Sequence, residues 1–249
     1  MSKHNNAPKS LECYACNQSA VSWEHAPPKG FYPRRQEVYG APKEKDYRRG
    51  LITVPSCDEH NTAKSGDDNF VQAAIIVFAA IYGNHFDQIE PHPFALKAIR
   101  RVQNGPRLRR VLIENAELVS TPYGEMIAVK PEVETIRRTL ELTARALYYH
   151  EHDYRRRWPG ACVVDSPHFV MPDLSEGPRS HAVDYMLTEF TGMHRAGHKE
   201  FELRGPHPDA FAYQFLERDG ICLMRMTFYG GFHFVAYSER LPSPTSVPE

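Results

Sequence analysis

Four residues with the chemistry of zinc ligands lie in the first quarter of the sequence. Cys13 and Cys16 form a C-x2-C pair, and Cys57 is followed three residues later by His60. Each short pair can turn two ligands toward one ion, and the chain between the pairs is then held as a loop or hairpin. The spacing predicts a structural Cys3His zinc site. The alternative is that these residues are ordinary buried thiols and a surface histidine.

A second group of residues suited to catalysis lies between and just after these pairs. Glu24 and His25 are followed by two prolines after one intervening residue, and Asn61 lies next to His60. An imidazole with an ordinary pKa near 6.5 can take a proton from water, and carboxylate and amide oxygens are hard ligands for a divalent cation. Cleavage of a phosphodiester needs an activated water and a cation that neutralises the phosphate. These residue types therefore fit phosphodiester hydrolysis.

The order of the motifs resembles that of the HNH nucleases with a zinc-stapled ββα-metal finger. The shared pattern is C-x2-C, then Glu-His-x-x-Pro, then a β-rich run before the third cysteine, and an Asn followed by Lys three residues later, and it covers about residues 12–70. The resemblance implies that Glu24 and Asn61 hold one Mg2+ or Mn2+ ion and that His25 is the general base. It also implies that Lys64 approaches the phosphate, although Lys64 could equally be a solvated lysine. The activity implied is endonuclease cleavage of nucleic acid, first of all DNA, in a bacterial or phage-type protein, with defence against foreign DNA as one possible context.

Two positions depart from the family pattern. The middle Asn of the family should fall near Gly50, which has no side chain to steady the base. A backbone carbonyl could take over that role, or the site could be impaired. His60 stands where relatives generally have a fourth cysteine, and it could join the catalytic metal instead of the zinc. The alternative function is therefore a zinc module that binds nucleic acid or a protein partner without cutting it.

The elements expected to carry these residues are two short strands and a helix. Residues 21–24 and 51–54 are β-rich runs suited to a hairpin. Residues 61–80 predict a helix, because apolar side chains recur there at intervals of three and four. Adjacent residues of a regular strand point to opposite faces, so Glu24 and His25 can share a site only where the backbone departs from regular strand geometry.

Two basic segments could contact a nucleic-acid backbone. One is the loop between the predicted strands, and the other comprises two predicted helices at 93–101 and 107–115, with no acidic residue between positions 97 and 110. Such cations can neutralise phosphates, although basic loops and helix faces are often simply solvated. The candidates are Arg34, Arg35, Arg48 and Arg49 in the loop and Lys97, Arg100, Arg101, Arg107, Arg109 and Arg110 in the helices.

The rest of the sequence predicts an α+β region of helices and antiparallel strands. Residues 131–152 have the clearest amphipathic helix pattern, and 126–130 predict a strand. Alternating apolar residues on either side of Tyr229–Gly231 predict a hairpin whose aromatic side chains form core rather than a base-stacking surface. Cys162 and Cys222 are expected in the core. The His150-Glu151-His152-Asp153 run is expected to be a polar helix end, because adjacent helix residues diverge too widely to chelate one ion.

The predicted organisation is an HNH-like module at 1–82, an α+β domain of unknown role in binding, recognition or assembly at 83–240, and a flexible tail at 241–249. The chain could form a homodimer or bind a partner protein through the second domain. We expect no membrane partner and a cytoplasmic location, because the first ten residues are polar and the longest apolar run, at 71–82, is half the roughly 20 residues of a membrane span. A net charge of −1 and 41% hydrophobic residues indicate a globular protein without a global basic excess.

Overall fold

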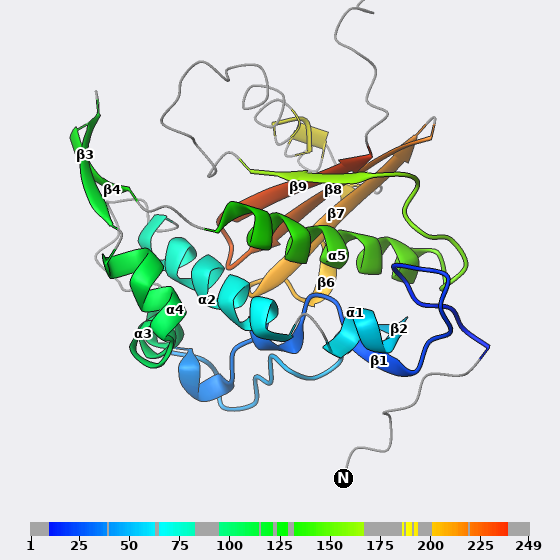
Figure 1. The fold of residues 1–249 in the computed structure, drawn as a ribbon, viewed down its shortest axis with the longest axis horizontal. Helices are drawn as coiled ribbons and strands as arrows, with labels where there is room; N and C mark the ends of the chain where they lie inside the picture. The colour runs from blue at the N-terminus through cyan, green and yellow to red at the C-terminus, as the bar shows by residue number, and fades with distance from the viewer. Residues whose placement is uncertain are drawn as a thin grey trace, which may run out of the picture.

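The computed structural model describes residues 10–38, 40–62, 65–82, 95–114, 116–121, 124–128, 132–166, 186, 188–190, 192–193, 201–218 and 220–238. The fold is mixed α+β (Figure 1). Its helices are α1 (Asp58–Thr62), α2 (Ser65–Tyr82), α3 (Ala95–Asn104), α4 (Pro106–Arg109) and α5 (Val133–Glu151), with 3-10 turns η1 (Lys29–Phe31) and η2 (Arg35–Glu37) and a π-helical turn η3 (Arg110–Glu114). Its strands are β1 (Ser22–His25), β2 (Thr53–Ser56), β3 (Glu117–Thr121), β4 (Gly124–Ala128), β5 (Cys162–Asp165), β6 (Arg204–His207), β7 (Phe211–Arg218), β8 (Ile221–Phe228) and β9 (Phe232–Ser238). Within these ranges no helix is both long enough and apolar enough to cross a membrane.

The expected N-terminal hairpin is confirmed, with strands one to two residues later than predicted. β1 and β2 are antiparallel, and their register pairs Glu24 with Val54 and His25 with Thr53. Helix α1 follows β2 at once and begins at Asp58 rather than at the predicted residue 61. Acidic side chains in a first helical turn interact favourably with the helix dipole, and this explains the earlier start. The single helix predicted at 61–80 is two helices, α1 and α2, and residues 63 and 64, with the candidate Lys64, lie outside the described residues.

A five-stranded antiparallel sheet in the order β5-β9-β8-β7-β6 forms the second half of the fold. The predicted hairpin is confirmed: β8 and β9 pair with Phe228 opposite Phe232. Gly230 in the turn has a φ of 78°, which glycine adopts without the strain that a Cβ would cause. The strand expected at 126–130 is observed as β4, which pairs with β3 in a separate two-stranded sheet. Strands β3 and β6 were not predicted from the sequence.

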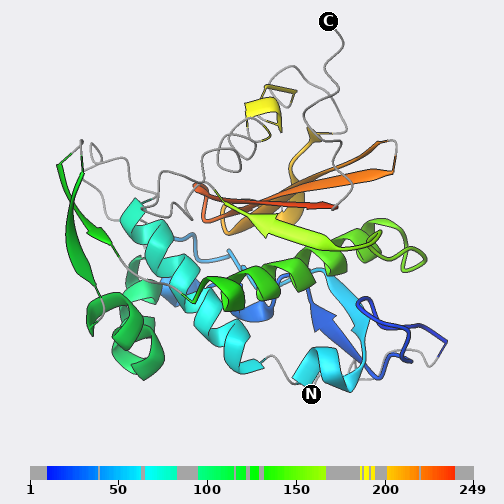
Figure 2. The same ribbon diagram turned by 45° about the horizontal axis from the view of Figure 1, so that its top comes forward.

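Helices α2 and α5 cover one face of the five-stranded sheet (Figures 1 and 2). Helix α5 confirms the amphipathic helix predicted at 131–152, and its buried side includes Leu140 and Leu147. The second predicted basic helix, at 107–115, is observed as the short α4 followed by η3. Pro106 stands at the first position of α4, where its missing N–H costs no intrahelical hydrogen bond.

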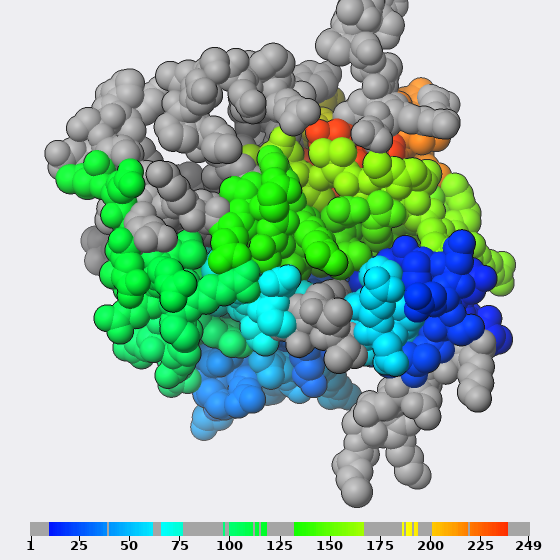
Figure 3. Space-filling model, viewed as in Figure 1, coloured from blue at the N-terminus to red at the C-terminus, as the bar shows by residue number. Residues whose placement is uncertain are grey.

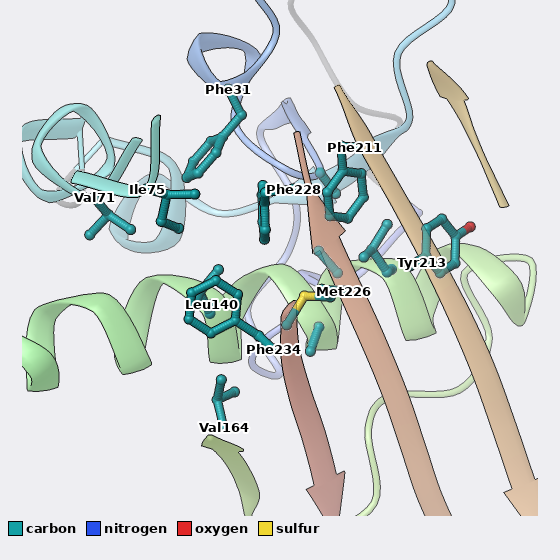
Figure 4. Packing of buried hydrophobic residues seen from close by; sticks show 14 of the residues in the cluster. Phe31, Val71, Ile75, Leu140, Val164, Phe211, Tyr213, Met226, Phe228 and Phe234 are labelled. Carbon is teal, nitrogen blue, oxygen red and sulfur yellow. The ribbon is translucent and has the colours of Figure 1, made fainter. Parts of the chain in front are cut away.

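The aromatic residues of the sheet are core, as expected. Phe228 is fully buried, and its ring centroid lies 4.9 Å from that of Phe211 and 5.8 Å from that of Phe234. The same ring lies 5.1 Å from Phe31 of η1, which joins the N-terminal segment to the sheet core (Figure 4). Cys162 and Cys222 are also buried. One hydrophobic cluster therefore extends across residue 82, and the division into domains there stays a prediction.

Candidate functional site

The four predicted zinc ligands converge on one point. The Nδ1 atom of His60 lies 3.2 Å from Sγ of Cys57 and 3.7 Å from Sγ of Cys13, and the Sγ atoms of Cys16 and Cys57 are 3.7 Å apart. All four ligand atoms lie within 4.8 Å of one another. The predicted Cys3His group is therefore confirmed as a set of residues that could hold a metal ion.

The geometry of the group fits tetrahedral zinc. Two sulfurs that are each about 2.3 Å from a tetrahedral ion lie about 3.8 Å from each other, close to the separation of Cys16 and Cys57. His60 faces the thiols with Nδ1, so the structure favours its role as the fourth zinc ligand over a role at a second metal. The backbone N–H of Ala15 donates to Sγ of Cys13 over 3.5 Å. Arg157 donates to the carbonyl of Cys13 over 2.9 Å and so ties this group to the region after α5.

Glu24 lies beside the metal group, in the interior of the protein. Its side chain is 7% exposed, and Tyr14, which is 1% exposed, donates a hydrogen bond to it. The pKa of the Tyr14 hydroxyl is raised well above its ordinary value of 10.0, chiefly by burial and then by the charges of Glu24, Cys13 and Asp68. Tyr14 therefore stays protonated as a donor. Since Tyr14 packs edge-on to the His60 ring with centroids 6.2 Å apart, it links the zinc group to Glu24.

His25 occupies the last position of β1 and has the electrostatics of a base that is neutral at pH 7. Burial lowers its pKa below the ordinary 6.5, and the charge of Lys29 lowers it further, whereas a hydrogen bond to the backbone of Ile52 opposes both effects. The backbone group that contacts the imidazole thus lies two residues after Gly50. Gly50 itself is exposed with a φ of 68°. The Nδ1 atom of His25 is buried and has no hydrogen-bond partner among the described residues.

Asn61 is brought to β1 by the first turn of α1. Its Nδ2 atom donates a hydrogen bond of 2.6 Å to Oγ of Ser22. Residues two apart on a strand share a face, so Ser22 and Glu24 point to the same side of β1. Asn61 therefore lies along the side of the hairpin that carries Glu24, and its Oδ1 atom is the one a hard cation could use.

The predicted basic residues differ in their environments. Lys97 is 1% exposed, and its Nζ donates to the carbonyl of Gly30 over 2.6 Å. Arg107 pairs with Asp67 over 3.1 Å and with Glu132. The exposed members of the predicted set are Arg34, Arg35, Arg49, Arg100, Arg107, Arg109 and Arg110, and the half-buried members are Arg48 and Arg101.

Three residues near the site were not predicted. Tyr14 lies between Cys13 and Cys16. The spacing of the two cysteines carries no information about the residues between them. Asp68 acts electrostatically on Tyr14 from α2, and Gln72 follows it one helical turn later, buried at 1% exposure. A polar residue inside an apolar helical run, such as Gln72 after Val71, is the sequence signal that could have marked this position.

The polar run at the end of α5 is occupied by contacts within the protein, as expected. Glu151 pairs with Arg204 and accepts a hydrogen bond from Tyr213, and Nε2 of His152 lies 3.2 Å from Glu217. These partners come from the sheet. The residues therefore join α5 to β6 and β7 and do not form a metal group.

No family model, no curated protein and no solved structure matches the chain.

Proposed function

We propose that the protein is a metal-dependent endonuclease of the HNH type that hydrolyses phosphodiester bonds of nucleic acid, with DNA as the expected substrate. The observation that carries the proposal is the position of Asn61, which α1 places on the Glu24 side of β1 through its hydrogen bond to Ser22. The zinc-ligand group fixes the start of the same helix through Cys57 and His60. The hairpin and the helix thus bring Glu24 and Asn61 to one side of β1. His25 is the next residue of the same regularly paired strand, so its side chain points to the opposite side, at the end of β1.

In this proposal each residue has a role that suits its environment. His25, whose lowered pKa keeps the imidazole neutral at pH 7, removes a proton from the attacking water. The hydrogen bond to the Ile52 backbone orients the ring. Glu24 and Asn61 would hold one Mg2+ or Mn2+ ion through oxygen atoms. When bound, such an ion supplies charge neutralisation for the phosphate and its leaving oxygen.

The zinc has a structural role in this proposal. Three thiolates and one imidazole complete a tetrahedral set, and a closed set of four protein ligands leaves no position for substrate. Chemistry is therefore assigned to Glu24, His25 and Asn61.

A non-catalytic zinc module is the second candidate. It is favoured by Gly50, which brings no side chain to the imidazole, and by the burial of Glu24 at 7% exposure. In this candidate the module binds nucleic acid or a protein partner without cutting.

Cleavage of supercoiled plasmid separates the two candidates. The purified full chain is incubated with Mg2+, with Mn2+ or with EDTA, beside His25→Ala and the control His152→Ala, which removes a histidine paired with Glu217 on the sheet. The nuclease predicts metal-dependent nicking or linearisation that His25→Ala loses and His152→Ala keeps. A folded, zinc-loaded wild type that leaves the plasmid intact supports the binding module, and normal cleavage by His25→Ala overturns the catalytic assignment.

A further inference from the structure

Two basic segments that lie more than 40 residues apart in the sequence meet around Lys97. The side chain of Lys97 comes from α3 and reaches the carbonyl of Gly30 in η1 over 2.6 Å. Its Nζ also lies 3.9 Å from Oε2 of Glu37 in η2. The loop after β1 and the helix α3 are thus in direct contact, and the space-filling view shows the light-blue loop and the green helical region side by side at one edge of the molecule (Figure 3).

Several positive charges gather at this contact. Arg34 and Arg48 from the loop and Arg101 from α3 each act electrostatically on Lys97. The pKa of Lys97 falls to about 7, mainly because it is buried and then because of these three cations, whereas Glu37 opposes the shift. Burial likewise lowers the pKa of Arg48, and Arg34 and Arg101 add to the effect. The arrangement holds like charges together at an energetic cost.

Two carboxylates of the loop, Glu37 and Asp46, act on cations of this group. Oε2 of Glu37 accepts a hydrogen bond of 2.7 Å from the backbone N–H of Arg34 in addition to its contact with Lys97. Nε of Arg48 donates to the carbonyl of Tyr32 over 3.0 Å, which fixes the guanidinium against the loop. Asp46 also acts on Arg48, and its Oδ1 accepts from the Arg48 backbone N–H. The cluster keeps an excess of positive charge, and an anion would relieve it.

Arg107 shows what a neutralised arginine looks like in the same region. Its guanidinium contacts both Asp67 and Glu132, and these carboxylates raise its pKa. Arg48 differs from Arg107: burial lowers its pKa, the charges of Arg34 and Arg101 lower it further, and Glu37 and Asp46 oppose the shift. From the sequence alone, all of these arginines were predicted to contact nucleic acid in the same way.

The cluster is connected to the candidate catalytic residue through a short piece of backbone. Gly30 lies five residues after His25, so an extended chain between them spans at most about 17 Å. A Cβ on Gly30 would lie 2.6 Å from Oε1 of the buried Gln72, so Gly30 is packed between Lys97 on one side and Gln72 on the other. Nucleotides rise about 3.4 Å each along a strand. The backbone at Gly30, which Lys97 contacts, is thus separated from His25 by at most about the length of five nucleotides.

We propose that Arg34, Arg48 and Arg101 form one phosphate cradle that holds the sugar-phosphate backbone of a nucleic acid beside the site of cleavage. Lys97 joins α3 to the loop through its hydrogen bond to the carbonyl of Gly30. The proposal rests on the nuclease function proposed above, and it narrows the predicted basic set to three residues. Contacts to phosphates position a nucleic acid without reading its sequence.

Binding is measured in the full chain carrying His25→Ala, so that cleavage does not interfere. Fluorescence anisotropy follows a labelled 20-base-pair DNA duplex and an RNA duplex of the same sequence over a series of salt concentrations. The test variant is Arg34→Ala with Arg101→Ala, and the charge-matched control is Arg138→Ala with Arg155→Ala, two exposed arginines outside the cradle. Arg48→Gln is the second test variant.

The cradle predicts that the double test variant binds about tenfold to thirtyfold more weakly at 150 mM salt, and that the slope of log affinity against log salt falls by about two. The control keeps the slope and the affinity. If the double test variant binds the DNA duplex more weakly, the cradle holds DNA. If it binds the RNA duplex more weakly, the cradle holds RNA. Zinc content and circular dichroism establish that each variant is folded. If the double variant does not fold, the affinity and salt slope of Arg48→Gln test the cradle in its place.

Failure of the cradle and failure of the nuclease are distinguishable. If the wild type cleaves plasmid and the test variants bind like the control, the cradle is overturned while the nuclease stands. If the wild type cleaves nothing and the test variants lose binding, the cradle is supported and the nuclease falls. If neither duplex binds at 50 mM salt, the cradle is overturned.

Discussion

Nδ2 of Asn61 donates a hydrogen bond of 2.6 Å to Oγ of Ser22 and so ties the first turn of α1 to the first residue of β1. This contact sets which side of the hairpin the helix faces. Because Ser22 and Glu24 share that side, this hydrogen bond holds the amide of Asn61 on the side of β1 that carries the carboxylate.

Substitutions of the two residues should therefore separate structure from catalysis. Ser22→Ala removes one hydrogen bond and should lower the free energy of unfolding by about 1 kcal/mol while cleavage persists. Asn61→Ala should cost a similar amount of stability and reduce cleavage by roughly a hundredfold or more, because it also removes a ligand of the divalent ion. Denaturant unfolding and plasmid cleavage measure the two effects. Equal cleavage by both variants would remove Asn61 from the proposed site.

The zinc group should be essential for the N-terminal module. Cys57→Ser and His60→Ala should each lose bound zinc, and structural zinc contributes on the order of 10 kcal/mol in zinc-finger peptides. His60→Cys should keep zinc, since it restores the four-cysteine set, and Cys162→Ala should keep it because that buried thiol lies outside the group. Zinc per chain is measured by elemental analysis. One zinc retained by both Cys57→Ser and His60→Ala would contradict the Cys3His site.

The rate of cleavage should fall at acidic pH. His25 acts as a base only when neutral, and burial and Lys29 hold its pKa below 6.5. The rate should therefore be independent of pH near 7 and fall as pH drops through the lowered pKa. Lys29→Ala removes a charge that disfavours the imidazolium, so it should raise the pKa of His25 and move the acid limb to higher pH. An acid limb at the same pH in both proteins would show that Lys29 does not act on the catalytic base.

The sequence predicted the parts of the site that depend on local spacing. Cys13, Cys16, Cys57 and His60 are two short pairs, and a tetrahedral ion imposes that spacing directly. The hairpin and α5 were also predictable, since turn residues and apolar periodicity are local signals. Pairing between distant strands, such as β5 with β9, is decided by contacts that no local pattern encodes.

The sequence did not predict the environments of the cations either, because contacts between residues distant in sequence decide them. Lys97 is buried because the carbonyl of Gly30 lies 67 residues away in sequence and next to it in space. Arg107 is neutralised by Asp67 and Glu132, which come from two other helical segments. A run of basic residues therefore predicts charge, but the tertiary contacts decide which cations face solvent.

The burial of Lys97 should appear in the pH dependence of stability. Its pKa is about 7 in the folded chain and 10.5 ordinarily, lowered by burial and by Arg48, Arg101 and Arg34, with Glu37 opposing. Between these values the unfolded chain holds a proton that the folded chain has released. Stability should therefore rise with pH from about 7 to 10.5, by at most about 1.4 kcal/mol per pH unit. Below pH 7 Lys97 is charged in both states, so its burial lowers stability by an amount that no longer changes with pH.

Comparison with Lys97→Met isolates this contribution, because methionine keeps an unbranched side chain without the charge. The difference in free energy of unfolding between wild type and Lys97→Met should grow in favour of the wild type as pH rises above 7. Lys45→Met is the control, since Lys45 is partly exposed and pairs with Asp209 over 3.5 Å. Its stability should follow the wild type at every pH. Parallel curves for wild type and Lys97→Met would mean that Lys97 titrates as an ordinary lysine, and the electrostatic cost of the phosphate cradle would then be absent.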